Sequence, residues 1–454
     1  MTQHNSDGAG LTNNGTQANG QAAGAGALID LEMWPERRLI RPYGSFRHVD
    51  FHVKVQSQSA PEPRERPAVA IGLVLDRSGS MHGTKITTAR QAAIAVLDRL
   101  DQRDRIAAVV FDDRIDVLQH AAPATAELRA RLRTELSRVE ARGSTALHEG
   151  WLTGCNAIAA EHIDTADRLT RCFLLTDALA NVGVTDTERI ASDAADVRAN
   201  AGVGTSTFGI GLDYNEALLG PMAVAGGGQF HHLRSPAEIA TTFLGELGEL
   251  LAVAVRDVRL EIQGAPGTTA EMISPYWMQT LPESSWTWAA TLGDLIGGEY
   301  RHVVVRFGFM NQAGQSGPLV RARLSWTDAS GVRAATAWQQ VVFAHADDAA
   351  RRAEVVRLDV QQVIGVQHAE RAQRLAVERS RNGDVAGARE VLQAVARRIA
   401  AYAGDDAELR AAVAQLEQAA ADLDRHGYAA ASAKEAYFAS QARSRGQRDL
   451  RAPQ

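Results

Sequence analysis

The sequence predicts an α/β domain with a mainly parallel central sheet, inserted in or next to a β-sandwich and followed by a C-terminal helical hairpin. Three observations support this prediction. Apolar runs alternate with amphipathic helical stretches from Ala68 to about Ala254, two-residue alternation follows from Val255 to about Ala344, and helical periodicity continues from Asp347. A continuous apolar run is expected of a strand buried on both faces, whereas two-residue alternation is typical of a strand with one buried face.

Within the α/β region, four buried strands are predicted in VAIGLVLD, RIAAVVF, TRCFLLT and GTSTFGIG. Helices are expected between and after them, in GTKITTARQAAIAVLDRL, ATAELRARLRTELSRV, LHEGWLTGCNAIAAE, DTERIASDAADVRAN and SPAEIATTFLGELGELLAVAV. Strands that alternate with helices imply right-handed crossovers and a parallel sheet. Ligands of such sheets gather at the carboxyl ends of the strands.

The sandwich strands are predicted in VRDVRLEIQG, WTWAATLG, YRHVVVRFGFM, PLVRARLSW and RAATAWQQVVFA. The earlier segment RHVDFHVKVQSQ alternates in the same way and has no partner in the α/β unit, so we expect it to join this sandwich. Helices follow in 347–380, 383–404 and 406–424, and Asp384 in the turn RNGD is a candidate N-cap. We expect these helices to form a docked hairpin.

These patterns divide the chain into six predicted segments. They are a disordered leader (1–27), a β segment that joins the sandwich (28–66), the α/β domain (67–254), the β-sandwich domain (255–345), a helical C-terminal region (346–445) and a tail (446–454). The leader consists mainly of Gly, Asn, Gln and Ala, which offer almost nothing to bury.

The composition narrows the functional classes. Hydrophobic residues make up 45% and charged residues 22% of the 454 residues, as in an ordinary globular protein. The formal net charge of -6 excludes a global basic field that would recruit nucleic acid. Two cysteines, Cys155 and Cys172, are too few for a disulfide framework, and we interpret them as core residues. Without a secretory signal or a membrane-spanning apolar run, the sequence predicts a cytoplasmic protein with no membrane insertion.

The strand VAIGLVLD continues directly into DRSGSM, which places Asp76, Ser78 and Ser80 on a tight turn at its carboxyl end. Gly79 allows the backbone to bend closely there. Oxygen ligands of this kind suit a hard cation such as Mg²⁺. Taken alone, the same three residues could instead form a capping turn at the start of a helix.

DRSGSM resembles the DxSxS signature of von Willebrand factor type A domains, which complete a metal-ion-dependent adhesion site with a threonine and an aspartate from two later loops. RGSTALHEG offers Thr145 and FLLTDALANVG offers Asp177 at the expected places. The resemblance covers about Val69 to Leu251. It implies that Ser78 and Ser80 coordinate the metal directly, Thr145 directly or through water, and Asp76 and Asp177 mainly through water.

One position departs from the family pattern, because Ala178 stands where family members usually have Gly. The added methyl group is tolerable if the backbone φ is negative and harmful otherwise. His82 and His148 lie near the predicted site, and we interpret them as a solvated rim. We interpret His231 and His232 as packing or surface residues.

The resemblance implies a binding module of the bacterial intracellular type, in which the metal (Mg²⁺, or Mn²⁺ or Ca²⁺) binds a Glu or Asp carboxylate of a protein partner. Family analogy suggests AAA ATPases, signalling cassettes or defence systems as sources of that partner. One alternative is a Mg²⁺-dependent hydrolase or phosphatase, although no HExxH, GxSxG or phosphate-loop motif lies near these loops. The other alternative is a purely structural scaffold. We predict that the protein is not an enzyme.

Overall fold

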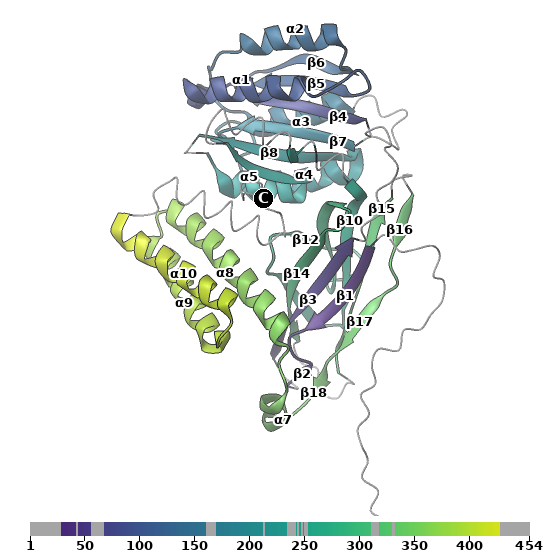
Figure 1. Cartoon of the computed structure of the whole chain (residues 1–454), viewed down its shortest axis with the longest axis vertical. Coiled ribbons are helices and arrows are strands. Elements are labelled where there is room, and N and C mark those ends of the chain that lie inside the picture. The colour runs from purple at the N-terminus through teal and green to yellow at the C-terminus, as the bar shows by residue number, and fades with distance from the viewer. Residues whose placement is uncertain are drawn as a thin grey trace, which may run out of the picture.

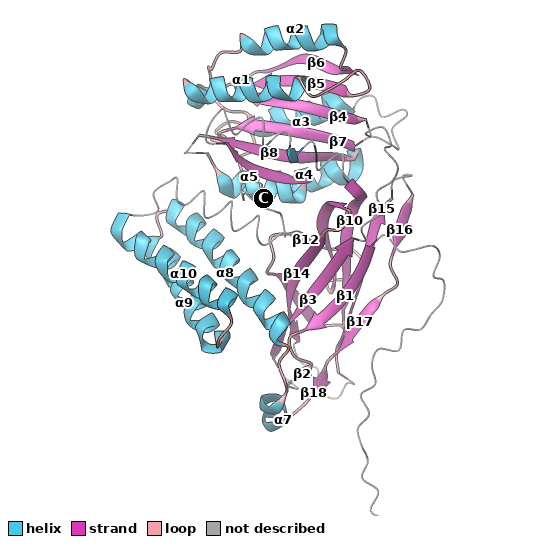
Figure 2. Ribbon diagram, viewed as in Figure 1, coloured by secondary structure: helices cyan, strands magenta, loops and turns pink. Residues whose placement is uncertain are grey.

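The computed structural model describes residues 29–41, 44–55, 68–159, 169–211, 214–233, 242, 245, 246, 248, 253–309, 317–328 and 332–426. The predicted leader, the tail and most of the helix predicted at 235–255 lie outside these residues. The α/β unit forms one end of the molecule, and the sandwich and the C-terminal helices lie side by side below it (Figure 1). Figure 2 shows that the strands of the sandwich and the helices of the C-terminal unit are cleanly separated.

The α/β unit has a six-stranded mixed sheet in the order β6-β5-β4-β7-β8-β9. All neighbouring strands are parallel except β6, which runs antiparallel to β5. The strands are β4 (Val69–Asp76), β5 (Arg105–Phe111), β6 (Ile115–Pro123), β7 (Leu169–Thr176), β8 (Val203–Ile210) and β9 (Gly227–Leu233). The four strands predicted as buried are β4, β5, β7 and β8, so this part of the prediction is confirmed.

Helices cover both faces of this sheet. α1 (Thr84–Leu97) and α2 (Ala126–Ser137) pack on one face, and α3 (Leu147–Ala159), α4 (Thr187–Ala201) and α5 (Glu216–Ala225) pack on the other. At Gly72 of β4, a Cβ atom would lie 3.2 Å from the carbonyl oxygen of Gly154 in α3. The glycine therefore lets α3 approach the sheet closely.

The sandwich consists of two antiparallel sheets around one apolar core. The first sheet contains β1 (Ile29–Pro35), β3 (Ser45–Val55), β14 (Tyr300–Phe309) and β11 (Thr268–Met272). The second contains β12 (Trp277–Thr280), β13 (Thr287–Ile296), β10 (Val253–Gly264), β15 (Leu319–Thr327) and β16 (Arg333–Ala335), and β17 (Gln339–Val342) also pairs with β15. Because β3 pairs along its length with β14, the α/β unit is inserted between strands of one sheet, as the lone strand in the sequence predicts.

A buried ionic cluster joins the α/β unit to the sandwich. Asp294 of β13 binds Nη2 of Arg171 through Oδ2 at 3.0 Å and binds Nη2 of Arg198 through Oδ1. These three side chains are only 4–6% exposed. Arg171 also donates to the carbonyl oxygen of Gly227 at 2.7 Å, and Arg198 donates to Asp257 at 2.6 Å. The two units therefore share a network of charge-assisted hydrogen bonds.

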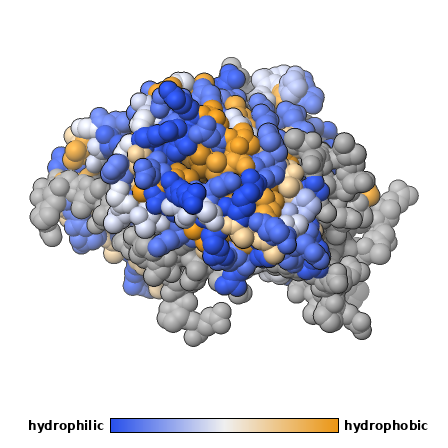
Figure 3. Space-filling view, turned by 90° about the horizontal axis from the view of Figure 1, so that it is seen from above, coloured by the Kyte–Doolittle hydropathy of each residue, from blue (hydrophilic) through white to orange (hydrophobic). Residues whose placement is uncertain are grey.

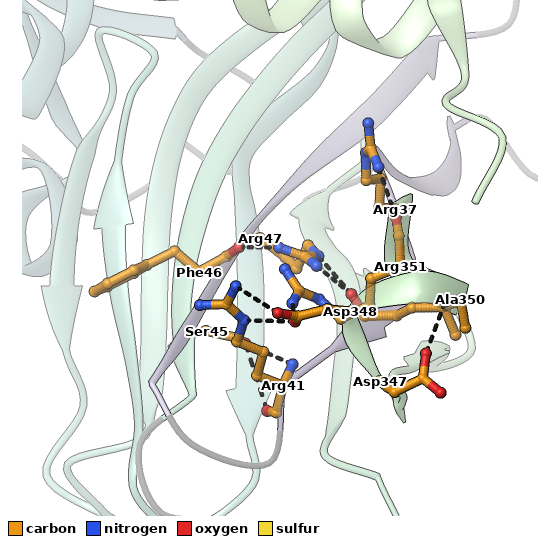
Figure 4. Close-up of polar contacts among 10 residues, drawn as sticks. Arg37, Arg41, Ser45, Phe46, Arg47, Asp347, Asp348, Ala350 and Arg351 are labelled. Carbon is orange, nitrogen blue, oxygen red and sulfur yellow. Dashed lines mark hydrogen bonds and ion pairs between the residues drawn. The ribbon is translucent and has the colours of Figure 1, made fainter. Parts of the chain in front are cut away.

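After the sandwich, the chain returns to its N-terminal segment. β18 (Ala344–His345) pairs in parallel with β2 (Leu39–Ile40), and the short helix α7 (Asp348–Ala353) follows. In Figure 4, Asp348 lies between Arg41, whose Nε donates to it at 3.1 Å, and Arg351, whose Nη1 lies 2.7 Å away. Arg37 donates to the carbonyl oxygen of Arg351 at 3.0 Å. These contacts tie α7 to the segment between β1 and β3.

The C-terminal unit consists of α8 (Leu358–Arg381), α9 (Val385–Ala403) and α10 (Ala407–His426), which share one apolar core. The three predicted helices are therefore present, but they form one three-helix unit instead of a hairpin, and the first of them is divided into α7 and α8. The predicted N-cap is confirmed, because the Asp384 carboxylate accepts the backbone N–H of Gly387 at 2.8 Å. None of the helices in the described part of the chain is long and apolar enough to span a bilayer.

Seen from above the end that carries α2 and β6, apolar residues gather near the middle of the face and hydrophilic residues surround them (Figure 3).

In the other part of the molecule, α8 lies against the first sandwich sheet through a small apolar cluster, which comprises Ile273, Val304, Val360 and Ile364. Beside that cluster, Nε2 of His368 on α8 lies 3.0 Å from Nε2 of His48 on β3. Nδ1 of His48 lies 3.1 Å from Glu36, so its Nε2 is the atom that faces His368. A positive charge on the buried ring of His368 would weaken this contact, and the packing of α8 against the first sandwich sheet therefore depends on a neutral His368.

We expect the stability of the protein to fall as the pH decreases from 6.5. Burial lowers the pKa of His368 to about 3, and the charges of His48 and of Arg398, Arg371 and Arg306 act in the same direction. The unfolded chain therefore takes up a proton below pH 6.5 that the folded chain does not, and stability is lost as the pH falls between these two values. The loss between pH 6.5 and 5 should be about 2 kcal/mol.

Urea denaturation at a series of pH values checks this expectation. His368→Gln should flatten the pH dependence between 6.5 and 5, whereas replacement of the exposed His82 by Gln should leave it unchanged. An equal slope in wild type and His368→Gln would contradict the assignment.

Candidate metal centre

The turn after β4 is organised by the carboxylate of Asp76. Its Oδ1 accepts the backbone N–H of Ser78 at 2.8 Å, and its Oδ2 accepts the hydroxyl of Thr176 at 2.5 Å. The hydroxyl oxygens of Ser78 and Ser80 lie 3.1 Å apart. Asp76 is fully buried, and burial raises the pKa of its carboxyl to about 7, with the charge of Asp177 adding to the rise. An uncompensated carboxylate is therefore costly here.

The loop that carries Thr145 is hydrogen-bonded to this turn. The N–H of Gly79 donates to the carbonyl oxygen of Gly143 at 3.0 Å. On its other side, the N–H of Thr145 donates to Oδ1 of Asn181 at 2.8 Å, and the carbonyl oxygen of Thr145 accepts the N–H of Asn181 at 3.2 Å. Thr145 therefore lies between the turn after β4 and the loop after β7.

Asp177 follows β7 directly, and its side chain is fully buried. Its Oδ2 lies 2.9 Å from Nζ of Lys85 on α1. Its backbone carbonyl accepts the N–H of Asn215 at 3.2 Å. All five predicted residues thus lie on three connected loops at the carboxyl ends of β4 and β7. Thr176 and Lys85 also belong to this site and were not predicted.

Asp112, at the end of β5, holds these loops together and was not predicted either. Its Oδ2 accepts Nε of Arg77 at 3.1 Å and Nε of Arg142 at 2.6 Å. Its Oδ1 accepts the N–H of Arg114 at 2.6 Å. Since Arg77 lies within the Asp76 turn and Arg142 precedes Thr145, one buried carboxylate connects both loops. The sequence signal was FDDR, an acidic pair at the end of a buried strand.

The donor set fits a hard divalent cation. It comprises two buried carboxylates and three hydroxyls, and hydroxyl and carboxylate oxygens are ligands that Mg²⁺ accepts. Across the described residues, no group of three or more His, Cys, Asp or Glu side chains could hold a metal ion. A metal centre at this place therefore depends on hydroxyl oxygens. Ser80 is exposed, whereas Asp76, Ser78, Thr145 and Asp177 are buried, so the site opens to solvent at Ser80.

Ala178 adopts the left-handed conformation, with a φ of 52°. Of the two possibilities, a negative or a positive φ, this is the unfavourable one, because the Cβ atom of a non-glycine residue makes close contacts with the backbone in this region. Its N–H donates to the hydroxyl of Thr176 at 2.7 Å, which holds the strained residue in place. Ala178 is buried, so its methyl group offsets part of this strain by packing.

We expect Ala178→Gly to change the free energy of unfolding by less than about 0.5 kcal/mol, because lost strain offsets lost packing and added chain entropy. Ala191→Gly is the matched control, since Ala191 is equally buried but lies within helix α4. There the substitution should cost about 1 kcal/mol or more. Chemical denaturation of both variants makes the comparison, and equal losses would contradict the strain.

The histidine interpretations have mixed outcomes. His82 is exposed, as expected of a rim residue. The expectation for His148 was wrong, because its ring is buried and its Nε2 lies 2.8 Å from Asp193. His231 and His232 are buried, and His231 lies 2.8 Å from Glu246. Cys155 and Cys172 are free and buried in the core, as predicted.

Comparison with known proteins identifies the α/β unit. The family model of the von Willebrand factor type A domain matches residues 70–243. The chain is 18% identical to a solved structure described as von Willebrand factor type A from Catenulispora acidiphila, with a TM-score of 0.66 over 92% of this chain and 96% of that one. The VWA2 paralog of ArnB from Sulfolobus acidocaldarius is 16% identical, with a TM-score of 0.60 over 92% and 99%. This chain therefore contains a von Willebrand factor type A domain.

Two sequence relatives each match less than half of this chain. An uncharacterized protein of Synechocystis sp. is 29% identical over 216 residues, which are 47% of this chain and 48% of that protein. Human inter-alpha-trypsin inhibitor heavy chain H4 is 27% identical over 208 residues, which are 43% of this chain and 22% of that protein. The chain thus matches half or less of the length of these relatives, so their roles do not transfer to it directly.

Proposed function

We propose that this protein is a metal-dependent binding module that captures an acidic side chain of a partner protein. The observation that supports this proposal is that Asp76, Asp177 and the hydroxyl-bearing residues lie on loops that are hydrogen-bonded to one another at one end of the sheet, where Ser80 is exposed. Members of the von Willebrand factor type A family are known for protein–protein interaction and metal-dependent adhesion.

In the proposed site, Ser78, Ser80 and Thr145 hold the cation, and Asp76 and Asp177 balance its charge. When bound, the cation supplies an open coordination position for a carboxylate oxygen. Such a contact is charge-assisted, and it is strong enough to centre an interface of modest size. Leu179 and Val182, on the loop that follows Asp177, are 36% and 38% exposed and would flank this contact.

Analogy with the family suggests the metal, the location and the kind of partner. We propose Mg²⁺ as the metal, with Mn²⁺ or Ca²⁺ as substitutes, and a cytoplasmic location. A protein of an AAA ATPase, signalling or defence system is the kind of partner that the analogy suggests. In this proposal the sandwich and the C-terminal helices are the scaffold that presents the binding domain.

Two other functions use the same site. A Mg²⁺-dependent phosphatase would need a nucleophile or general base beside the metal. Lys85 and Asp177 form an ion pair at 2.9 Å, and Nε2 of His148 lies 2.8 Å from Asp193, so neither Lys85 nor His148 is presented as a free base here. A purely structural scaffold would bind partners equally well with and without metal.

The first test of the proposal is metal binding by the purified full chain. At a Mg²⁺ concentration 100 times its dissociation constant, wild type should gain about 2.7 kcal/mol of stability over the protein in EDTA. Asp76→Ala should gain nothing. Asp405→Ala, which removes an exposed carboxylate from the C-terminal unit, should respond as wild type does. Thermal unfolding and titration calorimetry give both quantities.

The second test is partner capture from lysate of the source organism, with wild type, Asp76→Ala and Asp405→Ala, each in Mg²⁺ and in EDTA. A protein retained by wild type and Asp405→Ala in Mg²⁺ alone supports the binding module. Identical capture in every condition would favour the scaffold. Hydrolysis of a phosphoester that is lost in Asp76→Ala would favour the enzyme.

A further inference from the structure

The ammonium group of Lys85 contacts one of the two buried carboxylates of the candidate metal centre. Nζ of Lys85 lies 2.9 Å from Oδ2 of Asp177. The Lys85 side chain is 16% exposed and the Asp177 side chain is fully buried, so the contact is largely shielded from water. It joins helix α1 to the loop after β7, on either side of the Asp76 turn.

Helix formation does not account for a lysine at this position. Lys85 is the second residue of α1 and lies in its first turn, where the helix dipole disfavours a positive charge. The chain also has only three lysines, Lys54, Lys85 and Lys434, among its 48 basic residues. Arginine presents a broad planar fork, whereas lysine presents a compact charge on a flexible stem. The carboxylate of Asp177 is the partner that makes a lysine favourable here.

We infer that Lys85 is a built-in counter-cation that holds Asp177 and competes with the divalent metal for it. This inference rests on the proposed function, since it concerns the same site. A metal that uses Asp177 brings two positive charges close to the ammonium, and the resulting repulsion in a shielded site weakens metal binding. Because the stem of Lys85 is flexible and partly exposed, the ammonium can move toward solvent when a metal binds.

Two consequences follow for the protein. Without metal, the salt bridge compensates a buried carboxylate that would otherwise destabilise the fold. With metal, the cost of displacing the ammonium raises the Mg²⁺ concentration at which the site fills. Lys85 therefore sets the threshold at which the binding surface becomes competent.

The test is Mg²⁺ and Mn²⁺ titration calorimetry on the full chain with Lys85→Met, which keeps an unbranched stem of similar length and removes the charged ammonium. We expect the variant to bind both metals about tenfold more tightly than wild type. Lys54→Met is the matched control, because Lys54 is an exposed lysine on strand β3 of the sandwich. Its removal alters the net charge equally and should leave the affinity unchanged.

Thermal unfolding in EDTA and in Mg²⁺ provides a second readout. Lys85→Met should be less stable than wild type in EDTA and should gain more from Mg²⁺. If Lys85→Met does not fold without metal, Lys85→Gln takes its place, since its neutral amide can still donate to Asp177. A larger Mg²⁺-induced gain in either variant supports the inference.

The outcomes separate this inference from the proposed function. Equal or weaker metal binding by the Lys85 variants, with normal binding by wild type, overturns the competition and leaves the metal-dependent module standing. Binding by Lys85→Met alone supports the inference in its strongest form. If neither wild type nor any Lys85 variant binds metal, both proposals fail.

Discussion

Replacing Asp294 by Ala should cost about 3–5 kcal/mol of stability, because it leaves two buried arginines without the carboxylate that they share. Arg171 and Arg198 both bind Asp294, and all three side chains are nearly inaccessible to solvent. The backbone N–H of Asp257 also donates to Asp294 at 3.1 Å and would lose its acceptor. The loss should appear first at the junction between the von Willebrand factor type A domain and the sandwich.

Urea denaturation measures the total cost, and limited proteolysis shows whether the two units separate before either unfolds. Asp359→Ala is a suitable control, since Asp359 forms an exposed ion pair with Arg357 and should cost less than about 1 kcal/mol. Equal losses in the two variants would mean that the buried cluster does not hold the junction.

The same carboxylate makes the junction sensitive to acid. Burial alone would raise the pKa of Asp294, but the charges of Arg198 and Arg171 outweigh it and hold the pKa below its usual value of 3.8. The stabilisation is therefore fully present above pH 3.8 and is lost as the pH falls through the depressed value. In Asp294→Ala this acid-dependent loss should be absent.

Much of the fold could be predicted from the sequence because burial leaves a periodic signal. β4 is apolar up to Leu75 since helices cover both of its faces, and β3 alternates since only one face contacts the sandwich core. β6 was missed because it is an edge strand whose residues are mostly exposed or half-buried, so IDVLQHAAP carries no clear period. The short strands β11 and β12 have too few residues to show one.

The candidate site divides along a similar line. The turn that contains Asp76, Ser78 and Ser80 could be predicted because it lies at the end of a buried strand. Thr145 and Asp177 could be predicted because the segments that carry them resemble those of a known family. Lys85 and Asp112 act through contacts between segments that are distant in sequence, and neither belongs to the family signature, although the acidic pair in FDDR marks the position of Asp112. The sequence also showed that Ala178 departs from the family, but only the backbone shows the sign of its φ.

Replacing Asp112 by Ala should weaken both the fold and metal binding. Asp112 accepts three hydrogen bonds, and its side chain is 1% exposed. Its loss leaves the largely buried guanidinium of Arg77 with the half-exposed carboxylate of Asp116 as its ion-pair partner. We expect a loss of about 3 kcal/mol in stability. We also expect Mg²⁺ affinity to fall by about tenfold or more, as for other residues that orient ligands from outside the first coordination sphere.

Removal of any carboxylate near a cation site weakens cation binding through charge alone, so Asp112→Ala needs a control that removes the same charge. Asp116→Ala is that control, because Asp116 contacts the same two arginines, Arg77 and Arg142, but its side chain is 51% exposed. That variant removes the same charge beside the same loops, and it should cost less than about 1 kcal/mol. Titration calorimetry at two salt concentrations compares the variants, since screening removes the effect of charge and leaves that of position. Equal loss of Mg²⁺ affinity in both would show that Asp112 acts only as a charge. A larger, salt-resistant loss in Asp112→Ala would show that it positions the loops that carry Ser78 and Thr145.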